Sequence, residues 1–496
     1  MSTLENSLFS YCQTLKEVKL GSGLTSFGSS LFSNSPMVTD IYCKATTPPL
    51  LDFVTFYNGI SGPCNIHVPY NSFYAYKHGK WHKIYKDIFF LDPYDFTNDT
   101  QVDEPILNND EIWYISNTDS VITPYNTSGF SPSIKTHIFD YGKGIIKFNG
   151  NVTQVGSSAF YNIDDLTHIL LPETITSIGS SAFTSTSLYD ITIPKNVKTI
   201  GSGAFMNCTS LGTVTLPDGL ETIGAEAFDR CTAITYIRIP DSVKYINEDA
   251  FRQVKCEIDF GNGDPNFKLS DWGLNFKKIS GKYASSDNMC YVKNNKILFA
   301  GACPSNYTIP NGITEIGESA FYWQEKLTSL TIPDSVIKLD NKCFRRCEIL
   351  KTVKMGNGVQ SIGDYAFYNC KINDIIFSEN LKTIGKYSLG GGATYTNLVL
   401  PNSVQSIGEY AFDSSNNLVS CTIGENVTTI GDHLFSYCKK LETLYIKAVT
   451  PPTGRAYSLF INGTVPTIYV PTASVEAYKT ASGWSSYKNY IVGYDF

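Results

Sequence analysis

Apolar side chains recur along most of this chain in one fixed order, whose clearest mark is the phrase Ile-Gly-x-x-Ala-Phe. Its phenylalanine returns every 22 or 23 residues from Phe160 to Phe251. It does so again from Phe321 to Phe435, with Leu389 replacing it once. Degenerate copies end at Phe9 and Phe32. A period this regular predicts a repeat protein, in which each turn of the chain stacks on the turn before it.

Each period predicts a short strand followed by a turn. The segment Leu-x-x-Ile-x-Ile, as in Leu188 to Ile193, has the apolar spacing of a half-buried strand. A proline such as Pro194 then ends the strand, because proline has no N–H to give to a sheet. The glycine of the phrase allows either a tight bend or a close approach of another backbone, and the alanine and phenylalanine fill the core. The strands of successive repeats are expected to form one parallel sheet.

The outward-facing residues of these strands are expected to line up in columns. One column reads His168, Asp190, Thr213, Tyr236, then Ser329, Thr352, Asp374, Asn397, Ser420, Thr443. The next reads Leu170, Thr192, Thr215, Arg238, then Thr331, Lys354, Ile376, Val399, Thr422, Tyr445. The candidate binding residues on and beside these columns are Tyr189, Asp190, Tyr236, Arg238, Lys354, Asn397 and Tyr445. Tyrosine and arginine would be the anchors, because they dominate interface energetics. The alternative is that threonine is simply a good exposed strand residue.

This repeat resembles that of the BspA-like, type 5 leucine-rich repeat family, and its period lies within the ~20–29 residues of leucine-rich repeats. The resemblance covers most of the chain. It implies a β-rich leucine-rich-repeat solenoid with a parallel sheet, repeats of ~23 residues and short helical or turn segments. Proteins of this family are often secreted or at the cell surface, in gut Bacteroides-type bacteria and some protozoan parasites, and are linked to adhesion. The family pattern implies no enzymatic activity.

Two segments outside the period look like copies of one closing unit. Lys447 to Pro452 leads to Ile468, Trp484 and Ile491, as Lys44 to Pro49 leads to Ile66, Trp81 and Ile88. Each copy is expected to cover the end of a stack as a small α+β cap. The predicted organisation is a repeat stub at 1–46, a cap at 47–90, a linker and small β module at 91–144, the main solenoid at 145–446, and a C-terminal cap at 447–496 with short helices around 472–480 and 484–488.

The period fails at 256–306. There, Tyr283 to Tyr291 and Lys296 to Phe299 predict a hairpin that turns around Lys293, Asn294 and Asn295. The family often carries such a hairpin within its stack. Two interpretations fit it, an inert insertion or an excursion that contacts a ligand.

The composition narrows the classes of function. Of 496 residues, 42% are hydrophobic and only 17% are charged, so the chain can bury a large core beneath a surface rich in hydroxyl groups. The net charge of −7, with no basic stretch, excludes a general nucleic-acid binder. No apolar run is long enough for a transmembrane helix, and the first residues show no signal peptide. We therefore expect neither a nucleic-acid partner nor membrane insertion.

No catalytic, cofactor or metal site is predicted. The chain lacks the Gly-x-Ser-x-Gly, P-loop and Rossmann patterns. His78 and His82 could meet on one helix, but Ala481 and Ser485 stand at the matching places of the second cap, so surface positions are expected. Free thiols are expected for the 13 cysteines. Six of them share one repeat position that favours a small buried residue: Cys12, Cys208, Cys231, Cys347, Cys370 and Cys438.

The leading interpretation is a non-catalytic binding or adhesion protein for a protein or glycan partner. Leu4 and Leu8 already stand at core positions of the first repeat. Another subunit is therefore expected to cover that apolar edge, unless the first residues fold back over it. Two further roles remain open, a structural or host-recognition component of a bacteriophage particle and an intracellular interaction scaffold. Finding the protein at the cell surface, in a phage particle or in the cytoplasm would distinguish these three roles.

Overall fold

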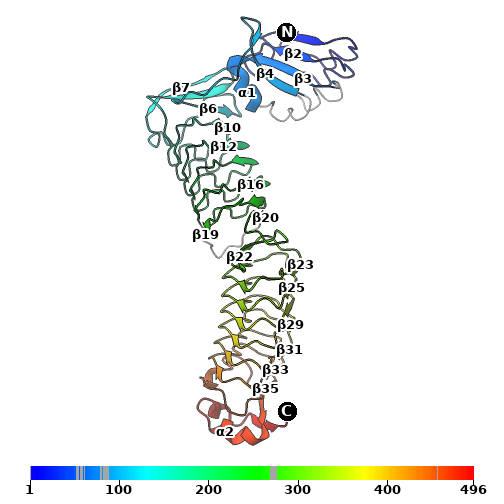
Figure 1. Ribbon diagram of the computed structural model, residues 1–496, viewed down its shortest axis with the longest axis vertical. Helices are drawn as coiled ribbons and strands as arrows, with labels where there is room; N and C mark the ends of the chain where they lie inside the picture. The colour runs from blue at the N-terminus through cyan, green and yellow to red at the C-terminus, as the bar shows by residue number, and fades with distance from the viewer. Residues whose placement is uncertain are drawn as a thin grey trace. The chain divides into compact units, whose positions relative to one another are not determined.

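The computed structural model describes residues 2–51, 55, 60, 62–78, 81, 89–247, 249–267, 276–454 and 456–496. The chain divides into two compact units, Met1–Phe251 and Arg252–Phe496. In each unit, short strands follow one another as the turns of a β-solenoid, which confirms the predicted fold class (Figure 1). The division falls within the segment 145–446, just before the interruption at 256–306.

Most repeats of the two main stacks contribute two strands, although the sequence predicted one. The longer strand comes from the Leu-x-x-Ile-x-Ile segment and pairs in parallel with its counterpart in the next repeat, as Asp190 with Thr213. The second strand has two residues and ends at the isoleucine before the glycine, as in the parallel pair Ile178 and Ile200. A two-residue strand is too short for an alternating pattern to reveal it, which is why the second sheet was missed.

The strands of the first unit's repeats fall into these two series. The longer ones are β1 (Glu17–Leu20), β2 (Asp40–Cys43), β12 (Asp190–Thr192), β14 (Thr213–Thr215) and β16 (Tyr236–Arg238). The two-residue ones are β9 (Gln154–Val155), β11 (Ser177–Ile178), β13 (Thr199–Ile200), β15 (Thr222–Ile223) and β17 (Tyr245–Ile246). The second series forms one parallel sheet along the main stack of this unit.

The second unit repeats the arrangement over more turns. Its longer strands are β23 (Asn306–Thr308), β25 (Ser329–Ile332), β27 (Thr352–Met355), β29 (Asp374–Ile376), β31 (Asn397–Val399), β33 (Ser420–Ile423) and β35 (Thr443–Ile446). The short ones are β24 (Glu315–Ile316), β26 (Lys338–Leu339), β28 (Ser361–Ile362), β30 (Thr383–Ile384), β32 (Ser406–Ile407) and β34 (Thr429–Ile430). Before them come β18 (Glu257–Asp259), β19 (Asn266–Phe267) and β20 (Lys278–Ser280).

The repeat anchors fill the core of each unit. Phe205 stacks on Phe183 and on Phe228, with ring centroids 5.2 and 5.3 Å apart, and all three side chains are fully buried. The glycine of the phrase lies where two repeats approach closely. A Cβ on Gly201 would lie 2.6 Å from the backbone nitrogen of Ser180 in the preceding repeat. Close approach is therefore the reason for glycine at this position, of the two that the sequence allowed.

The predicted hairpin at the interruption is confirmed and forms part of the solenoid, but its first strand begins at Cys290 instead of Tyr283 and includes Lys293. Strands β21 (Cys290–Lys293) and β22 (Lys296–Ala300) pair antiparallel. The turn residues Asn294 and Asn295 both have positive φ, of 51° and 59°, as a two-residue hairpin turn requires. Strand β22 also pairs in parallel with β24 and begins the sheet of two-residue strands. The insertion therefore starts a stack instead of projecting from it.

The two closing units share their local structure. The first has β3 (Cys64–Pro69), η1 (Tyr70–Ser72), α1 (Phe73–His78) and β4 (Phe89–Asp95). The second has η2 (Ala456–Ser458), β36 (Thr467–Pro471), η3 (Thr472–Ser474), α2 (Val475–Thr480), η4 (Trp484–Tyr487) and β37 (Ile491–Tyr494), so the short helices expected around 472–480 and 484–488 are confirmed.

Equivalent hydrogen bonds hold the helix of each closing unit. The hydroxyls of Tyr76 and Tyr478 donate to Ala45 O and Ala448 O, both at 2.8 Å. The indoles of Trp81 and Trp484 donate to Pro49 O and Pro452 O, at 2.7 and 2.9 Å.

The strand registers correct one of the residue pairs that were predicted to be equivalent in the two closing units. Ile66 pairs with Leu91 as Ile468 pairs with Ile491, so Leu91 is the counterpart of Ile491. The predicted counterpart, Ile88, lies outside the described residues. Strand β4 crosses the boundary drawn at residue 90, and Asp95 pairs with Thr100 at β5 (Thr100–Gln101). The interpretation of 91–100 as a linker was therefore wrong, because the aspartates and proline that suggested it belong to a paired strand.

A small antiparallel sheet precedes the main repeats of the first unit. It contains β6 (Glu111–Ser116), β7 (Ile134–Asp140) and β8 (Lys143–Phe148), where strands were expected. Its fourth strand, β10 (Leu166–Leu170), belongs to the first main repeat and pairs antiparallel with β6. His168, predicted at the exposed start of a column, is consequently buried, with 2% of its surface exposed.

Candidate binding surfaces

Within each unit, parts of the predicted columns are confirmed by the strand pairing. Asp190 lies opposite Thr213, Lys354 opposite Ile376, and Thr422 opposite Tyr445. The seven candidate residues divide between the two units. Tyr189, Asp190, Tyr236 and Arg238 belong to the first unit, and Lys354, Asn397 and Tyr445 to the second. No comparison or contact tests their role in binding, which stays a prediction.

In the second unit, one column of outward-facing strand residues exposes large apolar side chains to solvent. Ile376 is 53% exposed and Val399 is 66% exposed. The register continues from Val399 through Thr422 and Tyr445 into the cap, to Tyr469 and Val492. Ile376 holds the repeat position of Val399 one repeat earlier, in β29, which ends a separate sheet. We call these six residues, Ile376, Val399, Thr422, Tyr445, Tyr469 and Val492, the outer column. Exposed apolar residues that gather on one face mark interaction sites more often than isolated ones do.

An aromatic cluster ends the outer column. Tyr445 and Tyr469 stack with centroids 4.8 Å apart, and Tyr494 meets both edge-on at 5.4 and 5.5 Å. Phe496 lies 5.1 Å from Tyr494 and carries the ammonium of Lys447 above its ring. Sequence reasoning found Tyr445 but missed the others of this C-terminal aromatic cluster, because they come from β36, β37 and the last residue, outside the repeat period.

The first closing unit carries an equivalent cluster, which was also missed. Tyr42 stacks on His67 at 4.2 Å, and Tyr94 meets Tyr42 edge-on at 5.2 Å. Phe96 lies 5.0 Å from Tyr94, and the ammonium of Lys44 lies above its ring. A signal was present in the sequence, since Tyr-Asp-Phe occurs at 94–96 and again at 494–496.

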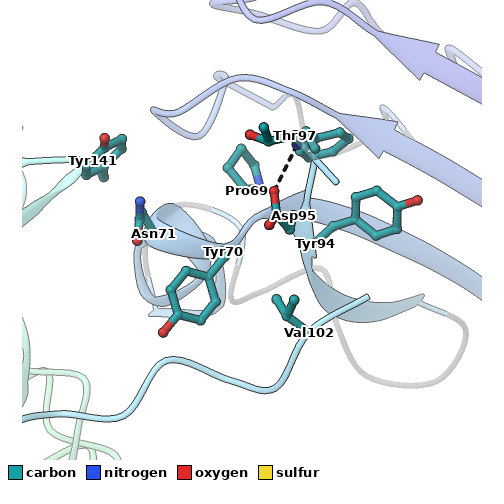
Figure 2. Close-up of a pocket in the computed structure, with 9 residues that line it drawn as sticks. Pro69, Tyr70, Asn71, Tyr94, Asp95, Thr97, Val102 and Tyr141 are labelled. Carbon is teal, nitrogen blue, oxygen red and sulfur yellow. Dashed lines mark hydrogen bonds between the residues drawn. The ribbon is translucent and has the colours of Figure 1, made fainter. Parts of the chain in front are cut away.

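A pocket of about 370 Å³ lies beside this first cluster (Figure 2). Its lining includes Tyr70, Asn71, Tyr94, Asp95 and Tyr141. The carboxylate of Asp95 is held in the turn, because it accepts a hydrogen bond from the backbone of Thr97 at 2.8 Å. Hydrogen bonding to the backbone of Thr97, and to Asn98, lowers the pKa of Asp95. The pocket therefore presents aromatic rings beside a fixed negative charge.

A charged groove follows the two-residue strands of the second unit. It encloses about 600 Å³ and is lined by Lys338, Asp340, Asp364, Lys386 and Glu409, among others. Burial alone would raise the pKa of Asp340, but hydrogen bonds from Lys296 and Lys338 outweigh it and lower that pKa to about 2. The charges of both signs are thus already paired within the repeats, which leaves little net field for an ionic ligand.

The repeated cysteines have a structural role. Five of these six thiols donate to the carbonyl of a phenylalanine anchor in the preceding repeat, as Cys208 to Phe183 O at 3.0 Å and Cys370 to Phe344 O at 3.1 Å. The thiol of Cys12 instead donates to Ser10 O at 3.7 Å. Burial raises the pKa of Cys438 to about 12, and it raises the pKa of Cys208 as well. All 13 cysteines are free, and 12 of them are buried, with Cys12 half-buried. Neutral buried thiols of this kind are poor nucleophiles and poor metal ligands.

The first repeat keeps Leu4 buried, while Leu8 is 46% and Tyr11 is 74% exposed. Cover of this edge by another subunit stays a prediction. Among the described residues, no helix is long and apolar enough to cross a membrane.

These features define the class of protein as a leucine-rich-repeat solenoid closed by two related caps. The sequence model of the BspA type leucine rich repeat region matches in six copies, over residues 1–61, 133–257 and 314–442. This is more than half of the chain, which therefore belongs to that family.

Solved structures with a similar fold come from several bacteria. A leucine-rich repeat protein from Bacteroides ovatus is 20% identical, with a TM-score of 0.42, over 89% of this chain and 82% of its own. The pneumococcal vaccine antigen PcpA is 16% identical, with a TM-score of 0.42, over 98% and 90%. A leucine rich cell surface protein from Faecalibacterium prausnitzii is 20% identical, with a TM-score of 0.35, over 88% and 89%. The chain has no match among curated proteins.

Proposed function

We propose that this chain is a non-catalytic binding protein of the adhesion type, which recognises a protein partner through the outer column of its second unit. The observation that carries the proposal is the exposure of the aliphatic side chains Ile376 and Val399 in one part of that column and of Val492 at its end in the cap. Leaving three such side chains in water has no advantage for folding, whereas covering them on binding gains about 25 cal/mol per Å² of apolar surface.

The aromatic cluster at the end of the column supports this proposal. Tyr445 and Tyr469 are half-buried against each other, so little side-chain entropy is lost when a partner packs on them. Tyrosine supplies both apolar area and a hydroxyl, which is why it is common among binding hot spots. Aliphatic Ile376 and Val399 favour a protein partner over a glycan, since they offer a sugar neither a hydrogen bond nor an aromatic face.

The test uses the purified full-length chain and two double variants. Ile376→Lys/Val399→Lys places charges in the outer column. Ile337→Lys/Ile349→Lys is the matched control, because these two isoleucines are 47% and 41% exposed in the same unit but lie outside the column. The probes are a panel of immobilised extracellular-matrix and serum proteins, measured by surface plasmon resonance, together with a glycan array.

We expect the wild type and the control variant to bind the same protein of the panel. The column variant should bind it at least ~10-fold more weakly, since two apolar contacts become buried charges. Binding to glycans alone, or equal losses in the two double variants, would contradict a protein-binding outer column.

A further inference from the structure

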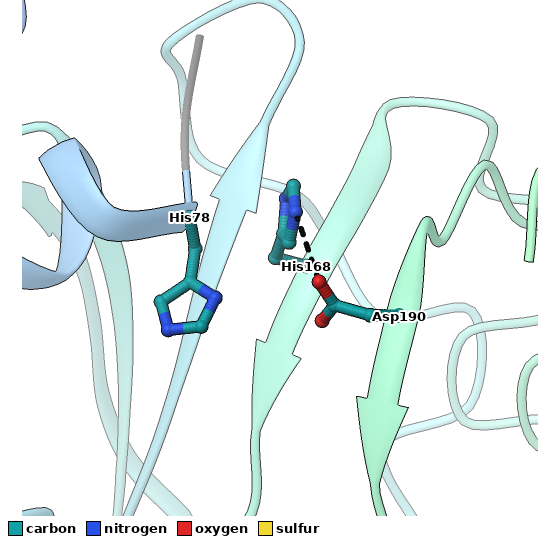
Figure 3. A group of neighbouring side chains, drawn as sticks. All are labelled: His78, His168 and Asp190. Atoms are coloured by element: carbon teal, nitrogen blue, oxygen red, sulfur yellow. Dashed lines mark ion pairs between the residues drawn. The ribbon is translucent and has the colours of Figure 1, made fainter. Parts of the chain in front are cut away.

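Three side chains with metal-ligand chemistry meet in the first unit, from segments far apart in the sequence. His78 is the last residue of α1, His168 lies in β10, and Asp190 begins β12. One nitrogen or oxygen atom of each lies within 4.8 Å of those of the other two. Figure 3 shows the imidazoles of His78 and His168 facing the carboxylate of Asp190 from the end of the helix and from the neighbouring strand.

The spacing matches what a small divalent cation requires. The Nε2 atom of His168 lies 3.6 Å from Oδ2 of Asp190. Zinc binds imidazole nitrogen and carboxylate oxygen at about 2.0–2.2 Å, so two ligand atoms of a tetrahedral site lie about 3.3–3.5 Å apart. His78 needs a shift of about an ångström to complete the site, which a half-buried side chain at a helix end can make.

The surroundings hold His168 with Nε2 towards Asp190. The ring is almost fully buried, and its Nδ1 lies 3.3 Å from the hydroxyl of Thr167. That hydroxyl donates its hydrogen to Ile115 O at 3.2 Å, so it can only accept from Nδ1–H. In the neutral imidazole this places the Nε2 lone pair towards the carboxylate, an arrangement that a cation between them stabilises. Outer-shell hydrogen bonds orient zinc-binding histidines in the same way.

Aromatic side chains also pack against the ring of His78. Its ring lies 4.6 Å from that of Tyr74, which packs on Trp113 at 5.9 Å. The ring of His78 lies 5.7 Å from that of His168 at 60°, so both imidazoles can direct a nitrogen to one point.

We propose that His78, His168 and Asp190 bind a divalent cation of the zinc class, with one coordination position left for water or for a group of a partner. The cation would join the helix of the first closing unit to β10 and β12 of the main repeats. This departs from the sequence analysis, which considered His78 only with His82 and expected no metal. His82 lies outside the described residues and is not part of the proposed site. The competing explanation is an imidazolium at His168 paired with Asp190, without a metal.

The first experiment is equilibrium dialysis of the chelator-treated full-length chain against zinc chloride. We expect one zinc per chain, and at least ~10-fold weaker binding in His78→Ala and in Asp190→Asn. The variants are made at His78 and Asp190 because both are half-buried, whereas His168 is buried and its removal would disturb the core. Asp40→Asn is the matched control. It alters the other close histidine–carboxylate pair, in which His67 Nε2 lies 2.9 Å from Asp40 Oδ1, and it should leave zinc binding unchanged.

Two further measurements distinguish zinc bound at this site from zinc bound by other groups of the protein. Cobalt in place of zinc should give the visible bands of a nitrogen and oxygen site, without the intense ultraviolet band that thiolate ligands add. Zinc should raise the melting temperature of the wild type but not of His78→Ala, and circular dichroism should show both folded. Absence of binding by the wild type, binding unaffected by both variants, or a thiolate band would overturn the proposal.

Discussion

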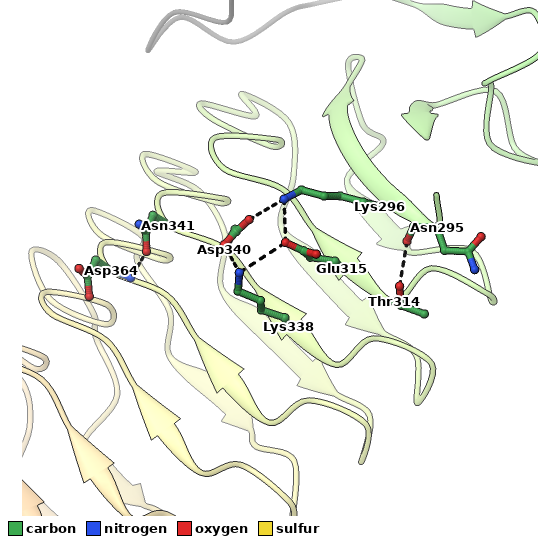
Figure 4. A network of polar contacts seen from close by, with 8 residues as sticks. All are labelled: Asn295, Lys296, Thr314, Glu315, Lys338, Asp340, Asn341 and Asp364. Atoms are coloured by element: carbon green, nitrogen blue, oxygen red, sulfur yellow. Dashed lines mark hydrogen bonds and ion pairs between the residues drawn. The ribbon is translucent and has the colours of Figure 1, made fainter. Parts of the chain in front are cut away.

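Lys296 of the hairpin lies 2.8 Å from the carboxylate of Asp340, although 44 residues separate the two in the sequence. The same ammonium lies 2.7 Å from Glu315, and Lys338 completes a network of two cations and two anions (Figure 4). The hairpin and the next two repeats are therefore linked by charge as well as by the parallel pairing of β22 with β24.

Acid should weaken this network. The folded-state pKa of Asp340 is about 2, below its ordinary value of 3.8, so its stabilisation is complete above about pH 5 and is lost as the pH falls towards 2. Asp340→Asn should cost on the order of 1 kcal/mol of unfolding free energy at pH 7, after allowance for solvent screening, and little at pH 2. Urea unfolding at both pH values measures this. Glu325→Gln, at an exposed position, is the control. An equal cost at the two pH values would contradict the role of Asp340.

The glycine of the repeat should not tolerate a methyl group. A Cβ on Gly201 would lie 2.6 Å from the backbone of Ser180, so Gly201→Ala forces two repeats apart. We expect it to cost about 2 kcal/mol or more. Gly212→Ala is the matched control, because its nearest neighbour would lie 3.7 Å away, an ordinary contact. Denaturant unfolding of both variants gives the comparison, and equal stabilities would show that close approach is not the constraint.

The thiols should be protected in the native protein. Twelve of the 13 cysteines are buried, and burial raises the pKa of Cys256 and of Cys438 to about 12. A thiol reagent at pH 8 should modify at most Cys12 rapidly, and all 13 after denaturation. Mass spectrometry of the labelled chain identifies the sites. Rapid labelling of Cys208 or Cys370 would mean that the repeats open readily.

The C-terminal cap should depend on one buried hydroxyl. Tyr478 donates to Ala448 O at 2.8 Å, and Tyr478→Phe leaves that buried carbonyl without this bond. The expected cost is about 1–3 kcal/mol. Tyr490→Phe, at a side chain that is 46% exposed, should cost nothing measurable. Thermal unfolding of the two variants decides whether this bond holds the helix of the cap.

The periodic part of the fold could be predicted closely. The order of Asp190, Thr213 and Tyr236 along a column followed from counting residues, because every repeat buries the same positions and so fixes the register of its strands. The turn at Asn294 and Asn295 followed from local chemistry in the same way. The prediction of a linker at 91–100 was wrong. The turn-forming residues there lie in β4, and the pairing of β4 with β3 outweighs their local preference for turns.

The sequence by itself determined the solenoid, its register and the similarity of its two caps, since these features repeat along the chain. It also determined the hairpin, through the turn residues there. Only the tertiary structure decided where non-periodic segments meet. It paired β10 with β6 and so buried His168, and it brought His78 to Asp190, more than a hundred residues away. The physical reason is that apolar periodicity specifies how neighbouring repeats stack, whereas the docking of a cap helix on distant strands depends on surfaces that exist only after the repeats have folded.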